Sequence, residues 1–261
     1  MQLQLIQTQL LNDFRNGTDR LQSAFDALAD AELSNEHFSF YTSVASVFSS
    51  KIEGEDIELD SYVKHKRWGE AFQPDYTRKT DDLYSAYDFA HTHALTRENI
   101  ASAHALLARN LVAENQLGRL RTGNMYVTTP DGKIEYVAAP PQELPVEMAK
   151  FYADLEMLLQ QQLTTEEAFY YASYLHLVFV KIHPWTDGNG RTARLLEKWF
   201  LAHHLGEKAW FIQSERYYYE HHAQYYHHLR ALGLEYETLD YTRALPFLGM
   251  LAGGVASTKS Q

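Results

Sequence analysis

The sequence predicts a mainly α-helical fold, a bundle packed around one central buried helix, with a single β-hairpin. Apolar residues recur at helical intervals along most of the 261 residues. The stretch 165–182 combines this spacing with a well-defined start, so it should be the buried centre. Only the segment 125–137 breaks the helical pattern, with two β-prone runs separated by turn residues.

Helices with recognisable ends are expected along the whole chain. We predict them over residues 3–15, 19–30, 35–53, 75–93, 97–112, 142–161, 165–182, 190–204, 215–231 and 240–252. The first has spaced apolar residues on one face and lacks the features of a signal peptide. The most apolar late segment, 244–256, is well short of the ~20 residues that a membrane-spanning helix needs. We therefore expect a single domain over 1–261, with residues 1–60 as its N-terminal helices.

The start of the central helix carries the clearest local signal. Thr164 and Glu167 have the spacing of a capping box, in which each side chain bonds the other residue's backbone N–H. Apolar residues then follow at helical intervals up to Ile182. His183 precedes Pro184, and a residue before proline is disfavoured in the α region, so the helix should end at His183.

The expected hairpin joins strands at Met125–Thr129 and Lys133–Val137 through a turn of Pro130, Asp131 and Gly132. A two-stranded ribbon is marginal alone and should lie against the helices. Its outer edge leaves backbone groups unpaired. The residues alone leave two readings open, a loop without function or an edge that accepts an extended peptide.

Composition excludes several classes of function. A net charge of −11 and an isoelectric point near 5.6 argue against nucleic-acid and membrane-surface partners, because both carry negative charge. The chain has no cysteine, which removes disulfides, thiolate metal sites and thiol nucleophiles. This composition fits a cytoplasmic protein. The oligomeric state stays open, and a homo-oligomer is compatible with the sequence.

The loop after the central helix concentrates chemically useful residues. Gly188, Asn189 and Gly190 form a glycine-rich turn that opens a helix, an arrangement that binds anions. Arg191 and Arg194 then occupy the first turn, where the helix dipole disfavours a cation by about 0.3–1 kcal/mol. Phosphate bound between these arginines and the helix start would remove that cost.

Two further groups belong to the same loop. Asp187 is suited to hold Mg²⁺ on the phosphates, since Mg²⁺ takes one or two carboxylates and completes its shell with phosphate and water. His183 can accept a proton near neutral pH. Each feature alone has an ordinary explanation as a structural histidine or a common turn. Their combination within twelve residues favours transfer of a nucleotide or phosphate group.

The segment HPWTDGNGRTAR, His183 to Arg194, resembles the signature of the Fic family. The resemblance extends over roughly residues 35–250 and includes GRLRTGN, APPQELP and SERYYYEHHAQYYHHL. It implies a Fic-type helical domain that transfers AMP from ATP to a Tyr, Ser or Thr hydroxyl of a target protein. The implied cofactor is Mg²⁺, with Mn²⁺ as an alternative ion.

The resemblance also implies roles for single residues. His183 deprotonates the hydroxyl and Asp187 binds the metal. The nucleotide and its phosphates are held by Gly188, Asn189, Gly190, Arg191 and Arg194, with Tyr226 near the adenine. The hairpin is similar to the family flap, which clamps a target segment by strand addition through Met125, Tyr126, Val127, Thr128 and Thr129.

Two positions within the motif qualify this resemblance. Trp185 stands where the family usually has Phe, and as a packing anchor it should have a small effect. Gly190 stands where relatives that act as phosphokinases carry Lys, which favours AMP transfer.

A second motif, SSKIEGE, places Ser49 and Glu53 four residues apart, followed by Gly54. Glu53 falls at the negative end of its helix, where a carboxylate is unfavourable. The pattern resembles the inhibitory motif of many Fic proteins, whose Glu pairs with the second motif arginine, here Arg194. We therefore expect an inhibitory helix over about 35–54 and low activity of the native chain.

Three other readings remain. In some relatives the same Glu orients a water that removes AMP, so removal through Glu53 is a second activity to consider. A nucleotide-binding regulatory module without turnover is another, although an intact His183 argues against it. A zinc site among the 13 histidines is disfavoured because none shows the HExxH spacing.

Overall fold

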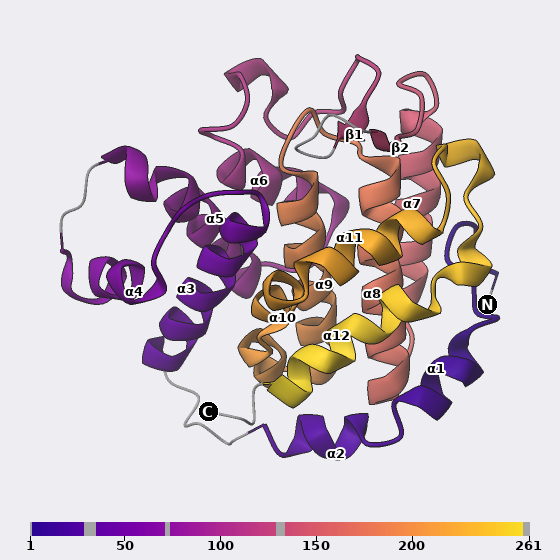
Figure 1. Cartoon of the computed structure of the whole chain (residues 1–261), viewed down its shortest axis with the longest axis horizontal. Coiled ribbons are helices and arrows are strands. Elements are labelled where there is room, and N and C mark those ends of the chain that lie inside the picture. The colour runs from indigo at the N-terminus through magenta and orange to yellow at the C-terminus, as the bar shows by residue number, and fades with distance from the viewer. Residues whose placement is uncertain (1, 29–34, 71–73, 129–133, 258–261) are drawn as a thin grey trace.

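The computed structural model describes residues 2–28, 35–70, 74–128 and 134–257, which form a mainly helical bundle (Figure 1). The N-terminal part contains α1 (Leu11–Gly17), α2 (Leu21–Asp26), α3 (Asn35–Ile52), α4 (Leu59–Trp68), α5 (Pro74–Thr92) and α6 (Arg97–Leu107). The hairpin strands β1 (Tyr126–Thr128) and β2 (Ile134–Val137) follow. The remaining helices are α7 (Leu144–Leu159), α8 (Thr165–Ile182), α9 (Asn189–Leu205), α10 (Ser214–Glu220), α11 (His222–Ala231) and α12 (Leu245–Ser257).

Helix α8 is the predicted central helix, and its predicted bounds are confirmed. Its capping box is present, with Thr164 N–H donating to Glu167 Oε2 at 2.8 Å and Glu167 N–H donating to Thr164 Oγ1 at 3.3 Å. Every residue from Ala168 to Ile182 is buried, because α7, α9 and α12 pack around the helix. This burial fixes the place where α8 ends, which is also where the motif begins.

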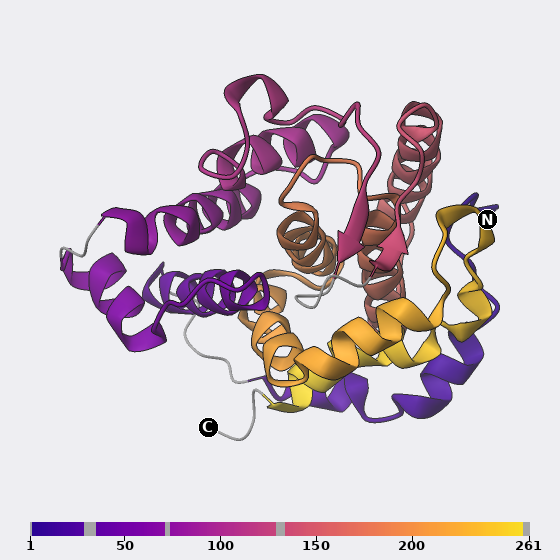
Figure 2. The same cartoon turned by 45° about the horizontal axis from the view of Figure 1, so that its top comes forward.

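Helices α3, α4 and α5 lie together on one side of the α8–α9 core (Figure 2). Helix α3 packs against both α5 and α10, and it also reaches α9. The C-terminal end of α3 is thereby brought to the start of α9. None of the helices in the described ranges is both long and apolar enough to cross a membrane.

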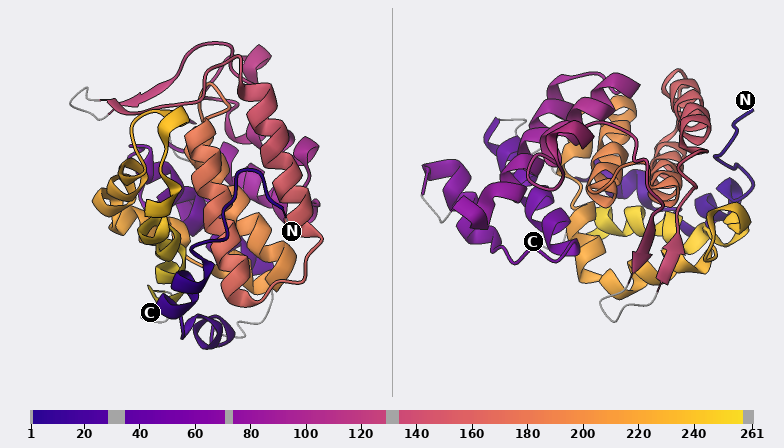
Figure 3. Two further views of the ribbon diagram at one scale, coloured as in Figure 1. Left: turned by 90° about the vertical axis from the view of Figure 1, so that its right-hand side faces the viewer. Right: turned by 90° about the horizontal axis from the view of Figure 1, so that it is seen from above.

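The hairpin is antiparallel, with Tyr126 opposite Val137 and Val127 opposite Tyr136, and it projects over α11 (Figure 3). Val137 N–H donates to Leu234 O at 2.7 Å, so the outer side of β2 is already engaged. The outer edge of β1 has no backbone partner within the described part of the chain. The expected flap position Thr129, like the expected turn at 130–132, lies outside the described residues.

The helix expected over 3–15 is wrong in its first half. Residues 2–10 contain no helix, and α1 begins at Leu11. The reason is the buried carboxylate of Asp154, which accepts hydrogen bonds from the backbone N–H groups of Gln4, Leu5 and Ile6 at 2.7, 2.8 and 3.0 Å. These bonds hold the N-terminal segment in a non-helical path across α7.

Other boundaries differ where local signals are weak. Helix α4 was not expected, since only Tyr62 of its ten residues is buried and its sequence is mostly polar. The helix expected over 215–231 divides at His221 into α10 and α11. Helix α2 ends at Asp26 and α6 at Leu107, both earlier than expected. The last helix runs over Leu245–Ser257 instead of 240–252.

Replacing Asp154 by Asn should lower the free energy of unfolding by about 2–3 kcal/mol, because a carboxylate that accepts three N–H bonds becomes an amide that presents N–H groups to them. Urea denaturation measures the loss, and hydrogen exchange of residues 4–6 locates it. Asp26→Asn, which changes an exposed carboxylate that accepts a hydrogen bond from Gln22, is the matched control. Equal effects of the two substitutions would contradict this account.

Candidate active site

The candidate catalytic loop, residues 183–190, begins at His183, the C-cap of α8. This residue adopts the left-handed conformation, with φ of 54°, and it is the one non-glycine residue with positive φ in the described ranges. The expected helix end is confirmed, although the backbone turns left-handed there instead of extended. The turn directs the chain into the loop before α9.

Arg121 holds this turn in place. Its guanidinium donates to the carbonyl oxygens of His183, Gly123 and Ala139 at 2.7, 2.6 and 2.6 Å, and its backbone N–H donates to Pro184 O at 2.9 Å. Burial lowers the pKa of Arg121, but its position at the carbonyl end of α8 favours a cation. One side chain thus joins the end of α8 to both arms of the hairpin.

The His183 imidazole is held as a neutral base. Burial is the largest effect and lowers the pKa of His183 to about 4, against smaller raising effects from Val180, Glu53 and Asp187. Its Nδ1 lies 3.1 Å from Val180 O and 2.7 Å from the Tyr136 hydroxyl. A neutral imidazole at physiological pH can accept a proton from a hydroxyl.

The glycine-rich turn is braced from inside by Asn189. The Asn189 side chain is buried, accepting from Trp185 N–H at 2.8 Å and donating to Trp185 O at 2.9 Å. Any contact of Asn189 with phosphate therefore falls to its backbone N–H. Gly188 has φ of 79°, and a Cβ there would lie 2.9 Å from Leu107 Cδ1, so glycine is required at this position.

His104 supports the same loop from α6. Gly118 N–H donates to its Nδ1, so the proton lies on Nε2, which donates to Asp187 O at 3.0 Å. Burial lowers the pKa of His104 to about 4, which keeps this ring neutral. The ring stacks on Trp185 with 4.5 Å between centroids.

Arg194, in the first turn of α9, binds the Ser49–Glu53 motif. Arg194 is buried and donates to Ser49 Oγ at 2.8 Å, to Ser49 O at 3.1 Å and to Glu53 Oε1 at 2.6 Å. The chain turns away after Glu53 through Gly54, which has φ of 87°. A Cβ on Gly190 would lie 2.6 Å from Glu53 Oε1, so this glycine leaves the space that the carboxylate occupies.

The Glu53 carboxylate is charged in this position. Burial acts to raise the pKa of Glu53, but the charges of Arg194 and Arg191 outweigh it and hold the pKa below its ordinary value. Arg191 forms an ion pair with a different carboxylate, that of Glu55, with 3.5 Å between Nη2 and Oε1. Lys79 binds the same carboxylate at 2.7 Å. Both motif arginines therefore face acids from the segment after α3.

Two tyrosines of α11 lie at the same site. Tyr225 is buried, with its hydroxyl 2.9 Å from His176 Nε2, and burial raises the pKa of Tyr225 to about 12. Arg194 has an electrostatic interaction with both Tyr225 and Tyr226. The half-buried Tyr226 ring contacts Tyr225 and His222. Tyr226, predicted to lie near the adenine, is therefore beside Arg194 in the structure.

Comparison with known proteins identifies a family for the segment that carries this loop. Residues 94–201 match the model of the Fic/DOC family, and this range contains His183, the glycine-rich turn, both arginines and the hairpin. This segment of the chain is a Fic/DOC domain. The Ser49 and Glu53 segment lies before the matched range, yet it contacts the family motif directly.

Solved Fic structures share the fold. A Fic family protein from Desulfovibrio desulfuricans superposes with a TM-score of 0.78 at 22% identity, covering 100% of this chain and 78% of that one. A Fic-domain signalling protein from Bacteroides thetaiotaomicron gives 0.68 at 19%, covering 92% and 93%. Fic-1 from C. elegans gives 0.67 at 19%, covering 96% and 71%. The Fic-type bundle with a hairpin, expected from the sequence, is therefore confirmed.

A curated relative adds a shorter match. Over 89 residues the chain is 37% identical to a uridine 5'-monophosphate transferase of Xanthomonas campestris. The aligned segment covers 33% of this chain and 17% of that protein.

The loop can contribute one ligand to a divalent cation. Asp187 is exposed, its Oδ1 accepts from Gly188 N–H at 2.6 Å, and its Oδ2 has no hydrogen-bond partner in the described part of the chain. One carboxylate fits Mg²⁺ that takes its other ligands from phosphate and water. Within the described residues no cluster of three histidines or acids could hold a metal alone.

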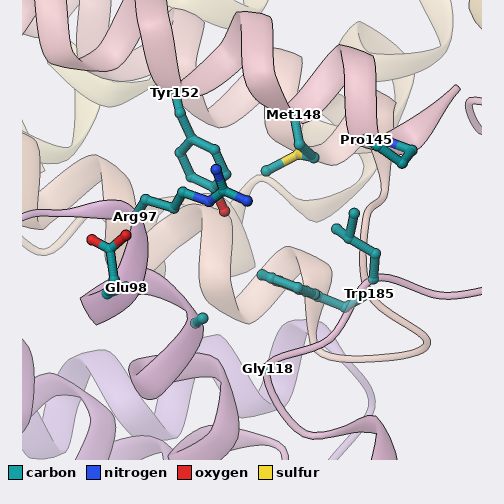
Figure 4. A pocket seen from close by; sticks show the side chains of 9 residues that line it. Arg97, Glu98, Gly118, Pro145, Met148, Tyr152 and Trp185 are labelled. Atoms are coloured by element: carbon teal, nitrogen blue, oxygen red, sulfur yellow. The ribbon is translucent and has the colours of Figure 1, made fainter.

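Trp185, the expected packing anchor, is buried and has a different neighbour on each side. One is the His104 ring, and the other is a pocket of about 320 Å³ between α6 and α7 (Figure 4). Arg97 extends over the Tyr152 ring in that pocket, 5.2 Å from its centroid. The indole thus forms part of the pocket wall while it supports the loop.

Sequence reasoning missed four residues that shape this site: Arg121, Tyr136, His104 and Glu55. Each acts across a long separation in sequence, so periodicity gives no sign of it. Glu55 alone has a local signal, because it follows Glu53 by two residues in the same acidic run. Of the expected hairpin residues, Met125 to Thr128 lie on the β1 side, at the free edge.

The low pKa of His183 gives a test that needs no substrate. With the folded pKa near 4, the imidazole should remain neutral from pH 8 down to about 5 and gain its proton only below that. Two-bond ¹H–¹⁵N NMR of ¹⁵N-histidine protein measures this, with the His183 signals assigned by their loss in His183→Ala. A midpoint near the ordinary value of about 6.5 would show that burial does not control this ring.

Proposed function

We propose that this Fic domain transfers AMP from ATP to a Tyr, Ser or Thr hydroxyl of a target protein, and that Glu53 inhibits the transfer. The observation that carries the proposal is the Glu53–Arg194 pair at 2.6 Å, at the start of the helix that follows the His183 loop. A buried arginine at a helix N-terminus, with glycines before it, is suited to the negative oxygens of a polyphosphate. The carboxylate occupies the position that such an oxygen would take.

The reaction needs a base, charge stabilisation and a leaving group. The target hydroxyl oxygen bonds to the α-phosphorus, the bond from that phosphorus to the β-bridging oxygen breaks, and pyrophosphate leaves. His183 takes the hydroxyl proton, and the loop N–H groups with Arg191 and Arg194 hold the phosphate oxygens. Asp187 would hold Mg²⁺, which neutralises phosphate charge when bound. The free edge of β1 would align an extended target segment.

Inhibition follows from competition for one cation. While Glu53 and Ser49 hold Arg194, a γ-phosphate finds that guanidinium already engaged. A triphosphate can then bind only with its terminal phosphate displaced, which misplaces the α-phosphorus relative to His183. Glu55 on Arg191 adds a second negative charge at the same place.

UMP transfer is the second candidate. It is favoured by one observation, the 37% identity over 89 residues to a protein named as a uridine 5'-monophosphate transferase. Removal of AMP through Glu53 and nucleotide binding without turnover are further alternatives, and the experiment below separates transfer from binding without turnover.

Glu53→Gly should raise transfer of labelled AMP to lysate proteins, or to the chain itself, by about 10–100-fold. The estimate takes the charge-assisted bond to Arg194 as worth about 1.5–3 kcal/mol. Labelled ATP and UTP are compared in parallel with Mg²⁺, and mass spectrometry identifies the adduct. A uridylyl adduct alone would replace AMP by UMP in the proposal.

The controls are matched in charge and in chemistry. Glu58→Gly removes a neighbouring exposed carboxylate that is 3.7 Å from Lys51, and it should leave transfer at the native level. Glu53→Gly with His183→Ala should bind nucleotide and transfer none. If Glu53→Gly binds ATP and UTP but produces no adduct from either, the transferase proposal is wrong, and a binding module becomes the better account.

A further inference from the structure

In the last turn of α8, the carbonyl oxygen of Val180 lacks its usual helical donor. Val180 O would accept from the N–H of residue 184, but Pro184 has none. Two other groups occupy this oxygen instead. The Tyr136 hydroxyl lies 2.6 Å from it and His183 Nδ1 lies 3.1 Å from it. A carbonyl oxygen has two lone pairs and can accept both bonds.

These groups also contact each other, and the three contacts fix the protons. Tyr136 Oη lies 2.7 Å from His183 Nδ1. If the hydroxyl donated to Nδ1, no proton would remain between Tyr136 Oη and Val180 O, and Nδ1 would face the same carbonyl without a proton. All three contacts are attractive only if the hydroxyl donates to Val180 O and Nδ1–H is shared between that carbonyl and Tyr136 Oη.

We propose that Tyr136 is a positioning residue that holds the His183 imidazole as its Nδ1–H tautomer, so that Nε2 carries the lone pair that accepts the proton. The inference rests on the proposed function, because it concerns the base of that reaction. Tyr136 itself does not touch the reacting atoms. It acts by supplying a second acceptor for Nδ1–H and by fixing the plane of the ring.

The position of Tyr136 on the hairpin gives this contact a further consequence. Tyr136 belongs to β2 and pairs with Val127 of β1, the strand whose outer edge is free for a target segment. Its ring is buried, with Lys181 Nζ 4.3 Å from the ring centroid and the His183 ring 5.8 Å away. The hairpin that would dock the target therefore also orients the base. Displacement of the hairpin would release the imidazole.

Tyr136→Phe is the direct test, in the Glu53→Gly background. Phe keeps the buried ring, and Val180 O keeps its bond from His183, so the fold should be retained. We expect kcat for nucleotide transfer to fall by about five- to tenfold, the effect of one lost hydrogen bond, with KM for the nucleotide unchanged. Tyr170→Phe is the matched control, since that buried hydroxyl also donates to a backbone carbonyl, Gln7 O at 2.7 Å, at the opposite end of α8.

The tautomer is measured independently of activity by two-bond ¹H–¹⁵N NMR of ¹⁵N-histidine protein without nucleotide. In the native chain His183 should carry its proton on Nδ1, and Tyr136→Phe should raise the Nε2–H population whereas Tyr170→Phe should not. A proton on Nε2 in the native chain, or identical His183 spectra and equal kcat with and without the Tyr136 hydroxyl, would overturn the inference. If Glu53→Gly transfers nothing, the proposed function fails while the NMR result still decides the role of Tyr136.

Discussion

A buried positive charge needs an anion as its partner, and Arg194 carries such a charge. Its side chain is 1% exposed, and it stands at the N-terminus of α9, where the helix dipole opposes a cation. Removing a charge from water costs several kcal/mol unless a partner compensates. In this structure the partner is Glu53, whose side chain is still 30% exposed. The anion therefore lies between a buried cation and solvent, where another anion can replace it.

The surrounding sequence is arranged to make this replacement feasible. Gly190 leaves the space beside the guanidinium that Glu53 fills, and Gly54 turns the chain away directly afterwards. Ser49 keeps two bonds to Arg194 that do not depend on Glu53. Under the proposed competition with a phosphate, Arg194 would retain these two bonds when Glu53 leaves and would keep its position.

The catalytic loop, in contrast, is fixed by groups from every side. Arg121 binds the carbonyls at the end of α8, Asn189 closes the loop on the Trp185 backbone, and His104 holds Asp187 O. The loop is thus fixed, whereas the Glu53 carboxylate beside it is partly exposed to solvent. A fixed loop keeps His183 and the glycine-rich turn in register, and in the proposed function the control of activity depends on one carboxylate, Glu53.

Helix ends and motifs that depend on residues close in sequence could be predicted. Contacts between residues far apart in sequence could not. The capping box of α8, its end before Pro184 and the acid–arginine match of Glu53 with Arg194 follow from spacing and known motifs. The helix expected over residues 3–15 was wrong in its first half because Asp154, which accepts hydrogen bonds from this segment, is about 150 residues away in sequence.

The side-chain direction of Asn189 and the parts played by Tyr136 and Arg121 likewise depend on tertiary contacts. A motif specifies which residues are present in a site. Packing decides which atoms they present.

The central claim, that Glu53 and a terminal phosphate compete for Arg194, is tested most directly by calorimetric titration of ATP and AMP into the native chain and Glu53→Gln. If the claim holds, the substitution tightens ATP binding by about tenfold or more, and AMP, which has no terminal phosphate to reach Arg194, changes by less than about twofold. Equal changes for the two nucleotides, or none for ATP, would contradict it.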